Sequence, residues 1–207
     1  AKIGIYDDLI AYQLSGSPNI NVVNMLNAKY VIQRQGNDKV ALQNPGALGN
    51  AWFVKTVKFV NGPVAEMKAL DTFNPSDTAV VDESFKNLVT AYTPADSSAT
   101  ISMTSFDNDA ITYKTSSTAN HVAVFSEIYY KDWKVYIDGK PASFFKANYV
   151  LRAMVVPAGN HTIEFKFEPA VYFTGKKISN IACWLIALLL LGCIAFQFRN
   201  NKKEQSA

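Results

Sequence analysis

The chain has 207 residues, of which 49% are hydrophobic, 18% charged and 13% aromatic, and its formal net charge is +3. A chain of this length has room for one or two small domains. The positive charge is small and dispersed, which excludes the basic surface expected of a nucleic-acid-binding protein, so we expect no nucleic-acid partner.

Residues 1–92 mix helical and strand patterns and predict a small α+β unit. The segment NINVVNMLNAKYVIQ predicts a short helix capped near Asn21, followed by a strand over Lys29–Gln33. The later elements of this unit are a strand over Val40–Gln43, a long strand over Asn50–Val60, a helix that begins at Pro63, and helical spacing over Glu83–Tyr92.

Residues 93–98 are small and polar and include a proline, so they predict a linker. Residues 99–170 then alternate apolar and polar side chains with period two. In HTIEFKF, for example, Ile163, Phe165 and Phe167 fall on one face. Alternation of this kind is typical of antiparallel strands with one face in water, and several such strands separated by turns predict a β-sandwich.

The segment YYKDWKVYIDGKPASFF is the most distinctive part of this β-rich region. Asp138-Gly139 predicts a two-residue hairpin turn, and Pro141 predicts that the following strand lies at a sheet edge. Trp133 alternates in phase with its apolar neighbours, so we expect its ring in the sandwich core, although a platform for stacking a sugar remains an alternative. Tyr136, Asp138 and Arg152 fall on polar or turn positions and could contact a glycan together with Trp133.

Residues 178–198 contain no charged side chain and no histidine. As a helix this run is about 31 Å long, which matches the hydrocarbon core of a bilayer. We therefore expect a transmembrane helix with the bilayer as a partner. Basic residues follow it more densely than they precede it, which favours a cytoplasmic tail over 199–207 and places residues 1–177 outside the cytoplasm. Cys183 and Cys193 both lie in this helix and are too far apart for a disulfide.

Motifs for metal, phosphate or nucleophilic chemistry are absent from the sequence. His121 and His161 stand far apart without further ligands at metal-binding spacing, and Asp107–Asp109 lack the rest of a calcium loop. No glycine-rich loop opens a helix after a strand, and no nucleophile elbow is present. We expect no metal, no cofactor and no catalytic residue within this chain.

Four segments, taken in order, resemble the C-terminal part of the YfhO family of bacterial membrane proteins. They are VVNMLNAKYVI, NPGALGNAWFV, YYKDWKVYIDGKPA and LRAMVVPAGNHTIEFKFEP, and a final membrane helix follows them. The resemblance implies a parent protein with further membrane helices ahead of Ala1, similar to lipid-carrier-dependent glycosyltransferases of the multi-spanning C type. It also implies that catalytic carboxylates lie in that preceding region, so none is carried over to this chain.

These observations favour one hypothesis and leave a second open. In the first, the chain is the C-terminal extracytoplasmic module of a glycosyltransferase-like protein of the bacterial cytoplasmic membrane. It would contact the preceding membrane helices and position or recognise a cell-envelope glycan acceptor or lipid-linked sugar, or only stabilise the parent. In the second, Ala1 follows a removed signal peptide, and the chain is a single-pass surface protein with a glycan-binding or adhesion sandwich.

Overall fold

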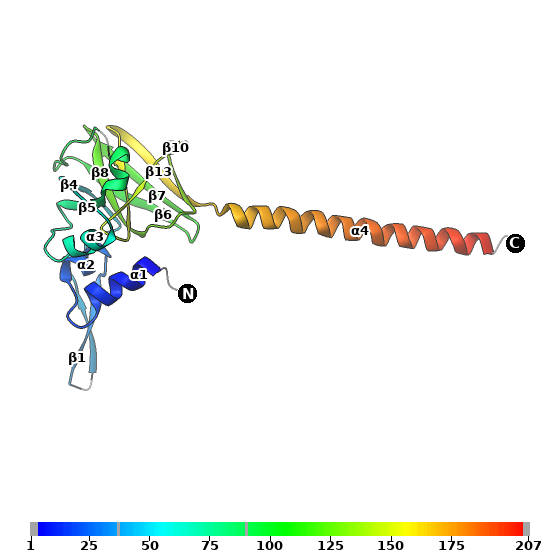
Figure 1. Cartoon of the computed structure of the whole chain (residues 1–207), viewed down its shortest axis with the longest axis horizontal. Coiled ribbons are helices and arrows are strands. Elements are labelled where there is room, and N and C mark those ends of the chain that lie inside the picture. Colours follow the sequence, from blue (N-terminus) through cyan, green and yellow to red (C-terminus); the bar gives the residue numbers. More distant parts are fainter. Residues whose placement is uncertain (1–3, 37, 90, 205–207) are drawn as a thin grey trace. The chain divides into compact units, whose positions relative to one another are not determined.

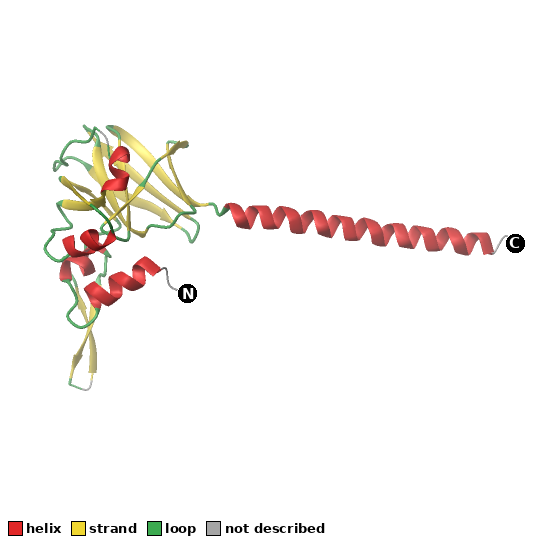
Figure 2. Cartoon of the chain, viewed as in Figure 1, coloured by secondary structure: helices red, strands yellow, loops and turns green. Residues whose placement is uncertain are grey.

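The structure is a computed structural model that describes residues 4–36, 38–89 and 91–204, with side chains as far as Cys193. It divides into two compact units, Ala1–Phe167 and Glu168–Ala207, which are described separately. The segment 93–98, which we expected to be a linker between two domains, lies inside the first unit. Figures 1 and 2 show the elements along the chain.

The N-terminal elements are short helices followed by a hairpin. Their bounds are α1 (Gly4–Leu9), the π-helical turn η1 (Ile10–Leu14), α2 (Ile20–Met25), β1 (Tyr30–Gln35) and β2 (Asp38–Gln43). Asn19 caps α2, since its side chain accepts a hydrogen bond from the Asn21 amide at 3.0 Å. The cap therefore lies two residues before the predicted one. In Figure 1 the hairpin β1–β2 extends away from the larger sheets of this unit.

The predicted long strand over Asn50–Val60 is two strands in different sheets, β3 (Ala51–Val54) and β4 (Thr56–Val60). At the break, the amides of Lys55 and Thr56 both donate to the carbonyl oxygen of Asp77, at 2.8 and 3.0 Å. The chain then continues through α3 (Pro63–Ala69), which begins at Pro63 as predicted, and β5 (Thr78–Asp82). The segment expected to be helical after β5 is the short 3₁₀ helix η2 (Glu83–Leu88).

Eight strands follow, and five of them form an antiparallel sheet in the order β10-β9-β13-β7-β6. The eight are β6 (Thr100–Phe106), β7 (Ala110–Ser117), β8 (His121–Ile128), β9 (Trp133–Ile137), β10 (Lys140–Ala142), β11 (Phe145–Ala147), β12 (Leu151–Val156) and β13 (Gly159–Phe167). The Asp138-Gly139 turn joins β9 to β10 with positive φ at both residues, and β10 is an edge strand, which confirms both expectations from the sequence.

The remaining strands form a four-stranded antiparallel sheet in the order β11-β12-β8-β3. The expectation of one wet face is wrong for this sheet. Along β8, Val122 and Val124 enter one buried cluster while Ala123 and Phe125 enter another. The reason is that this sheet is the middle layer: one face packs on the five-stranded sheet and the other on elements from the N-terminal half. A strand buried on both faces reads as continuously apolar.

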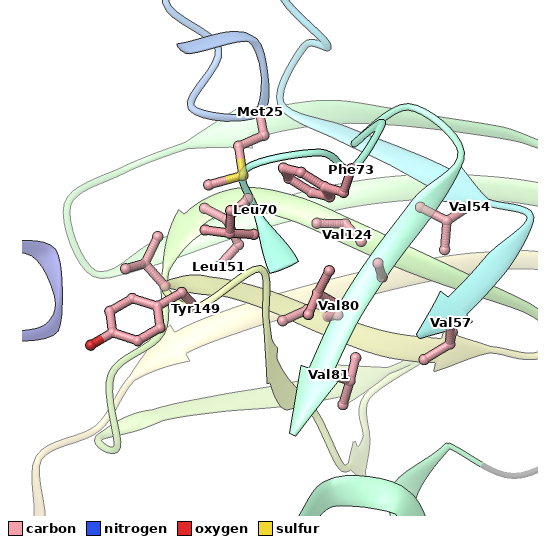
Figure 3. Close-up of a cluster of buried hydrophobic side chains, with 14 of the residues drawn as sticks. Met25, Val54, Val57, Leu70, Phe73, Val80, Val81, Val124, Tyr149 and Leu151 are labelled. Carbon is pink, nitrogen blue, oxygen red and sulfur yellow. The ribbon is translucent and has the colours of Figure 1, made fainter. Parts of the chain in front are cut away.

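The third layer contains α2, α3 and the parallel pair β4–β5, whose apolar side chains meet the outer face of the middle sheet. Figure 3 shows this cluster, in which Met25, Leu70 and Val80 lie near Val124 and Leu151. The mixed N-terminal part and the antiparallel sandwich of the fold prediction are therefore both present, and β3 ties them together.

The second unit consists mainly of α4 (Ala170–Glu204). The helix begins eight residues before the apolar run 178–198, so the basic pair Lys176 and Lys177 is helical. Among the described residues, one helix is long and apolar enough to cross a membrane, with the candidate span Ala170–Cys193. Its large apolar side chains, such as Leu188 and Leu191, are exposed. Of the predicted tail 199–207, residues 205–207 lie outside the described part of the chain.

Candidate functional site

A pocket of about 540 Å³ lies beside α1, η1 and α3 in the first unit. Its walls combine two aromatic rings, two carboxylates, one lysine and several apolar groups. The lining residues are Asp8, Tyr12, Gln13, Pro63, Val64, Met67, Lys68, Asp71 and Tyr149. We call this site the α1–α3 pocket.

The π-helical turn η1 supplies two neighbouring side chains with opposite environments. Tyr12 is 76% exposed, whereas Gln13 is buried and donates to the Asp71 carboxylate at 2.8 Å. Gln13 also accepts a hydrogen bond from the Asn19 side chain at 2.8 Å. Gln13 is thus held from both ends of its amide and fixes Asp71 at the pocket wall, while the Tyr12 ring stays available to a ligand. Single π-helical turns occur frequently at functional sites.

Tyr149 also lines the pocket, and its hydroxyl group is hydrogen-bonded. This group donates to a carboxylate oxygen of Asp8 at 3.2 Å. Burial raises the pKa of Tyr149, and the hydrogen bond to Asp8 raises it further. The phenol therefore stays protonated at neutral pH, and its hydrogen bond keeps the Asp8 side chain oriented at the pocket.

A buried ion pair lies behind Tyr149 and supports it. Glu66 is 0% exposed; one carboxylate oxygen accepts from the Tyr149 amide at 3.0 Å, and the other pairs with the Lys146 ammonium group. Burial raises the pKa of Glu66, while the attraction of Lys146 opposes this rise. The Lys146 nitrogen also lies 4.9 Å from the centre of the Tyr149 ring. These contacts fix both the backbone and the ring of Tyr149.

The loop that carries Tyr149 has an unusual backbone. Asn148 and Tyr149 are consecutive residues with positive φ, 49° and 70°. Such a conformation costs roughly 1–3 kcal/mol for each residue other than glycine, and it is concentrated at functional sites. Asn148 is held there by Val80: its amide donates to the Val80 carbonyl at 2.7 Å, and its side-chain oxygen accepts from the Val80 amide at 2.8 Å.

This arrangement offers several side chains that can contact a ligand. Asp8 and Asp71 offer oriented acceptors, Lys68 offers a donor, and Tyr12 offers an exposed aromatic face. In the described part of the chain, no three His, Cys, Asp or Glu side chains gather as a metal site would require. Carboxylates beside an aromatic ring match a neutral ligand rich in hydroxyl groups, since hydroxyls donate to the carboxylates while a C–H face packs on the ring.

The residues singled out from the sequence lie elsewhere in the same unit. Trp133 and Tyr136 line a smaller pocket of about 290 Å³ at the β9–β10 edge. The Trp133 ring is partly buried and packs against the core between the two sheets, as predicted. Asp138 lies in the hairpin turn, where it accepts from the Thr162 amide at 2.9 Å and pairs with His161 at 2.7 Å.

Arg152 does not face outward, contrary to the expectation from its polar type. It is 2% exposed, its Nε donates to the Ile128 carbonyl at 3.1 Å, and its guanidinium carbon lies 3.9 Å from the centre of the Trp133 ring. Burial lowers the pKa of Arg152 to about 10, and the charge of Glu127 opposes this effect. Because the middle sheet is covered on both faces, an arginine on β12 becomes a packing partner of Trp133.

Sequence reasoning missed the α1–α3 pocket. Asp8 and Tyr12 are four residues apart, a spacing that places them on one helical face, and this was the available local signal. Asp71 and Tyr149 come from distant segments, and no pattern in the sequence connects them to α1.

A β-rich unit followed by a helix long and apolar enough to span a bilayer is an architecture found in membrane proteins. The family comparison agrees with this class. The model of the family described as bacterial membrane protein YfhO matches residues 68–179, more than half of the chain, so the chain belongs to this family. Neither the curated proteins nor the solved structures give a significant match.

Proposed function

We propose that the chain is the C-terminal extracytoplasmic module of a multi-pass, glycosyltransferase-like protein of the cell envelope, and that it holds a glycan acceptor for that protein. The module itself is non-catalytic in this proposal. Its α1–α3 pocket binds a neutral sugar unit of the acceptor, and the preceding membrane region supplies the transfer chemistry.

The observation that carries this proposal is the pairing of an exposed aromatic ring with carboxylates that are already oriented. Tyr12 provides the ring, and the hydrogen bonds from Tyr149 and Gln13 fix Asp8 and Asp71. A site whose acceptors are fixed before binding loses little entropy when the ligand arrives. The strained backbone at Asn148 and Tyr149 supports the same view, because the fold maintains it with a buried ion pair.

The position along the chain also supports a role close to the membrane. Only Glu168 and Pro169 separate the end of β13 from the start of α4. A connection of two residues spans at most about 7 Å, so the folded unit cannot move far from the membrane helix. With residues 1–177 outside the cytoplasm, a glycan bound by this unit would stay near an active site in the membrane region.

A binding measurement on the full chain in lipid nanodiscs tests the proposal. The titrants are soluble neutral oligosaccharides of glucose, galactose and N-acetylglucosamine, followed by calorimetry. We expect at least one of them to bind and Tyr12→Ala to weaken its affinity about tenfold, the equivalent of one aromatic contact. Tyr12→Phe should bind nearly as well as the wild type, because the ring remains.

The matched control is Tyr30→Ala, which removes another exposed tyrosine that lies outside the pocket. It should leave sugar affinity unchanged. Failure of every oligosaccharide to bind, or equal affinity for wild type and Tyr12→Ala, would overturn the proposal. In the multi-pass parent, Tyr12→Ala should also reduce transfer to the acceptor without lowering the amount of protein in the membrane.

A further inference from the structure

The hairpin β1–β2 is exposed on both faces, although it contains several apolar side chains. Tyr30 is 65% exposed and Ile32 is 71% exposed, and Val31 and Leu42 on the opposite face are also exposed. Among the described strands, β1 pairs with β2 alone. A two-stranded hairpin without a covered face is only marginally stable in water. Its composition therefore indicates that something covers it.

Hydrogen bonds hold the base of the hairpin to the rest of the folded unit. The Asn44 amide donates to the Lys29 carbonyl at 2.8 Å, which closes the hairpin. The Asn44 side chain donates to the Ala28 carbonyl at 3.0 Å and to the Asn24 side chain at 2.9 Å. These bonds join the end of the hairpin to α2, while its strands extend away from the sheets (Figure 1).

The strand register divides the hairpin into two different faces. Residues directly opposite each other in an antiparallel pair share a face. Tyr30, Ile32, Arg34 and Lys39 therefore lie on one face, and Asp38 lies on the other. Arg34 and Lys39 are direct cross-strand partners, and like charges in that position destabilise a hairpin. An anionic surface would relieve this repulsion.

This combination of side chains matches the interface of a bilayer. Tyrosine is enriched at the level of the headgroups, aliphatic residues enter the boundary of the acyl chains, and arginine and lysine attract anionic lipids. A bilayer is also present where this protein resides, because the chain belongs to a membrane-protein family and carries a helix long and apolar enough to span one.

We propose that the face of β1–β2 that carries Tyr30, Ile32, Arg34 and Lys39 lies on the headgroup layer of a bilayer that contains anionic lipid. Arg34 and Lys39 contact the lipid phosphates, and Ile32 reaches the edge of the acyl region. The hairpin is thus a second, peripheral membrane contact in addition to the spanning helix, and it fixes the orientation of the folded unit on the membrane. This contact is separate from the α1–α3 pocket.

Neighbouring residues on opposite faces provide the test. The full chain, with Cys183→Ala and Cys193→Ala, carries a fluorophore on either Ile32→Cys or Gln33→Cys and is placed in nanodiscs with lipid-borne quenchers. We expect strong quenching at position 32 and weak quenching at position 33 when the nanodisc contains phosphatidylglycerol. In phosphatidylcholine alone, or at high salt, quenching at position 32 should fall toward the level at position 33.

Lys39→Glu separates loss of membrane contact from loss of the hairpin. It places opposite charges across the strands, which stabilises the hairpin itself, yet it weakens attraction to anionic lipid. We expect the ratio of bilayer-bound to free hairpin to fall at least about fivefold, the effect of removing one basic charge near such a surface. Tyr12→Ala is the control outside the hairpin and should leave this ratio of bilayer-bound to free hairpin unchanged.

Two results would overturn the proposal. Equal quenching at positions 32 and 33 in phosphatidylglycerol would show that the hairpin has no preferred face. A shift in the emission at position 32 without lipid quenching would assign the face to protein, either a second copy of the chain or another segment of the parent.

Discussion

Two antiparallel strand pairs in this molecule have the same number of residue pairs and opposite environments. In β8–β12, six residue pairs form the centre of the middle sheet, and nearly all of their side chains are buried. In β1–β2, six residue pairs form a hairpin whose side chains are nearly all exposed. Backbone pairing alone therefore does not determine what a strand pair contributes to stability.

Different interactions therefore determine the register of the two strand pairs. Burial on both faces specifies β8–β12, since a slip of one residue would exchange every side chain between two unlike clusters. A short turn determines the register of β1–β2, and Gly36 in that turn adopts positive φ. The first pair stabilises the fold, whereas the second is free to serve as a surface.

The strongest test of this comparison removes one large side chain from each pair. Phe125→Ala on β8 deletes a buried ring that lies 4.9 Å from Tyr113 and 5.0 Å from Phe165, measured between ring centres. We expect a loss of about 3–5 kcal/mol in the free energy of unfolding. Ile32→Ala on β1 should change it by less than about 0.5 kcal/mol. Denaturant unfolding of both variants, without lipid contact at the hairpin, provides the measurement, and similar costs for the two would refute the comparison.

A second test concerns charge rather than apolar volume. Lys146 on β11, next to β12, pairs with buried Glu66. Lys146→Met leaves the carboxylate buried without its partner, and we expect a loss of about 3–5 kcal/mol at neutral pH. Lys114→Met, on an exposed position of β7, is the control and should cost less than about 0.5 kcal/mol.

The pH dependence of the same variant has a definite sign. Burial raises the pKa of Glu66 above its ordinary value of 4.5, and the loss of Lys146 should raise it further. A carboxyl whose pKa is higher in the folded state binds its proton more tightly there, so acidification favours folding. The deficit of Lys146→Met should therefore shrink as the pH falls toward 4.5. A deficit that stays constant with pH would mean that Glu66 is not its cause.

A smaller effect is expected at Asn148, whose side chain and backbone amide bond the edge of β5 as a neighbouring strand would. Asn148→Ala leaves the amide of Val80 without its acceptor and keeps a residue with a Cβ at φ 49°. We expect a cost of about 1–3 kcal/mol. Asn148→Gly loses the same hydrogen bond but tolerates positive φ, so it should cost less than the alanine variant. Unfolding curves that rank the two in the reverse order would contradict this account of the backbone.

The smallest effect is expected at the turn between β9 and β10. The ion pair there, between Asp138 and His161, is partly exposed, whereas the side chains of β8–β12 are mostly buried and those of β1–β2 are mostly exposed. The hydrogen bond to Asp138 raises the pKa of His161 above 6.5. The Thr162 amide and then His161 lower the pKa of Asp138 below 3.8. The histidine contribution is complete below pH 6.5 and is lost as the pH rises through the raised pKa, while the aspartate contribution is lost in strong acid. His161→Gln should lower the thermal midpoint slightly at about pH 5.5 and hardly at all at about pH 9; an equal shift at both would exclude the ion pair.

Local features were the ones that the sequence could predict. The Asp138-Gly139 turn, the start of α3 at Pro63, the alternation along β13 and the apolar length of α4 each depend on neighbouring residues. The continuous apolar run along β8 was visible in the sequence. That it reflects burial on both faces could not be predicted, because the layer covering the second face comes from a distant segment.

Features that depend on long-range contacts were not predictable. The break between β3 and β4 is fixed by the carbonyl of Asp77, more than twenty residues away. The α1–α3 pocket joins segments from both ends of the first unit, and its supporting pair, Glu66 and Lys146, is eighty residues apart. Arg152 was misplaced for the same reason, because its burial follows from a sheet that is covered on both faces.

The contact between Asn148 and Val80 also bears on how the protein avoids self-association. The side of β5 that faces away from β4 would otherwise offer a vacant row of amides and carbonyls to any extended peptide. Asn148 occupies both groups of Val80, and the Asn74 carbonyl accepts from the Thr78 amide at 3.0 Å. Asn148 thus blocks the free edge of β5 at Val80, and another extended chain cannot form backbone hydrogen bonds with Val80 there.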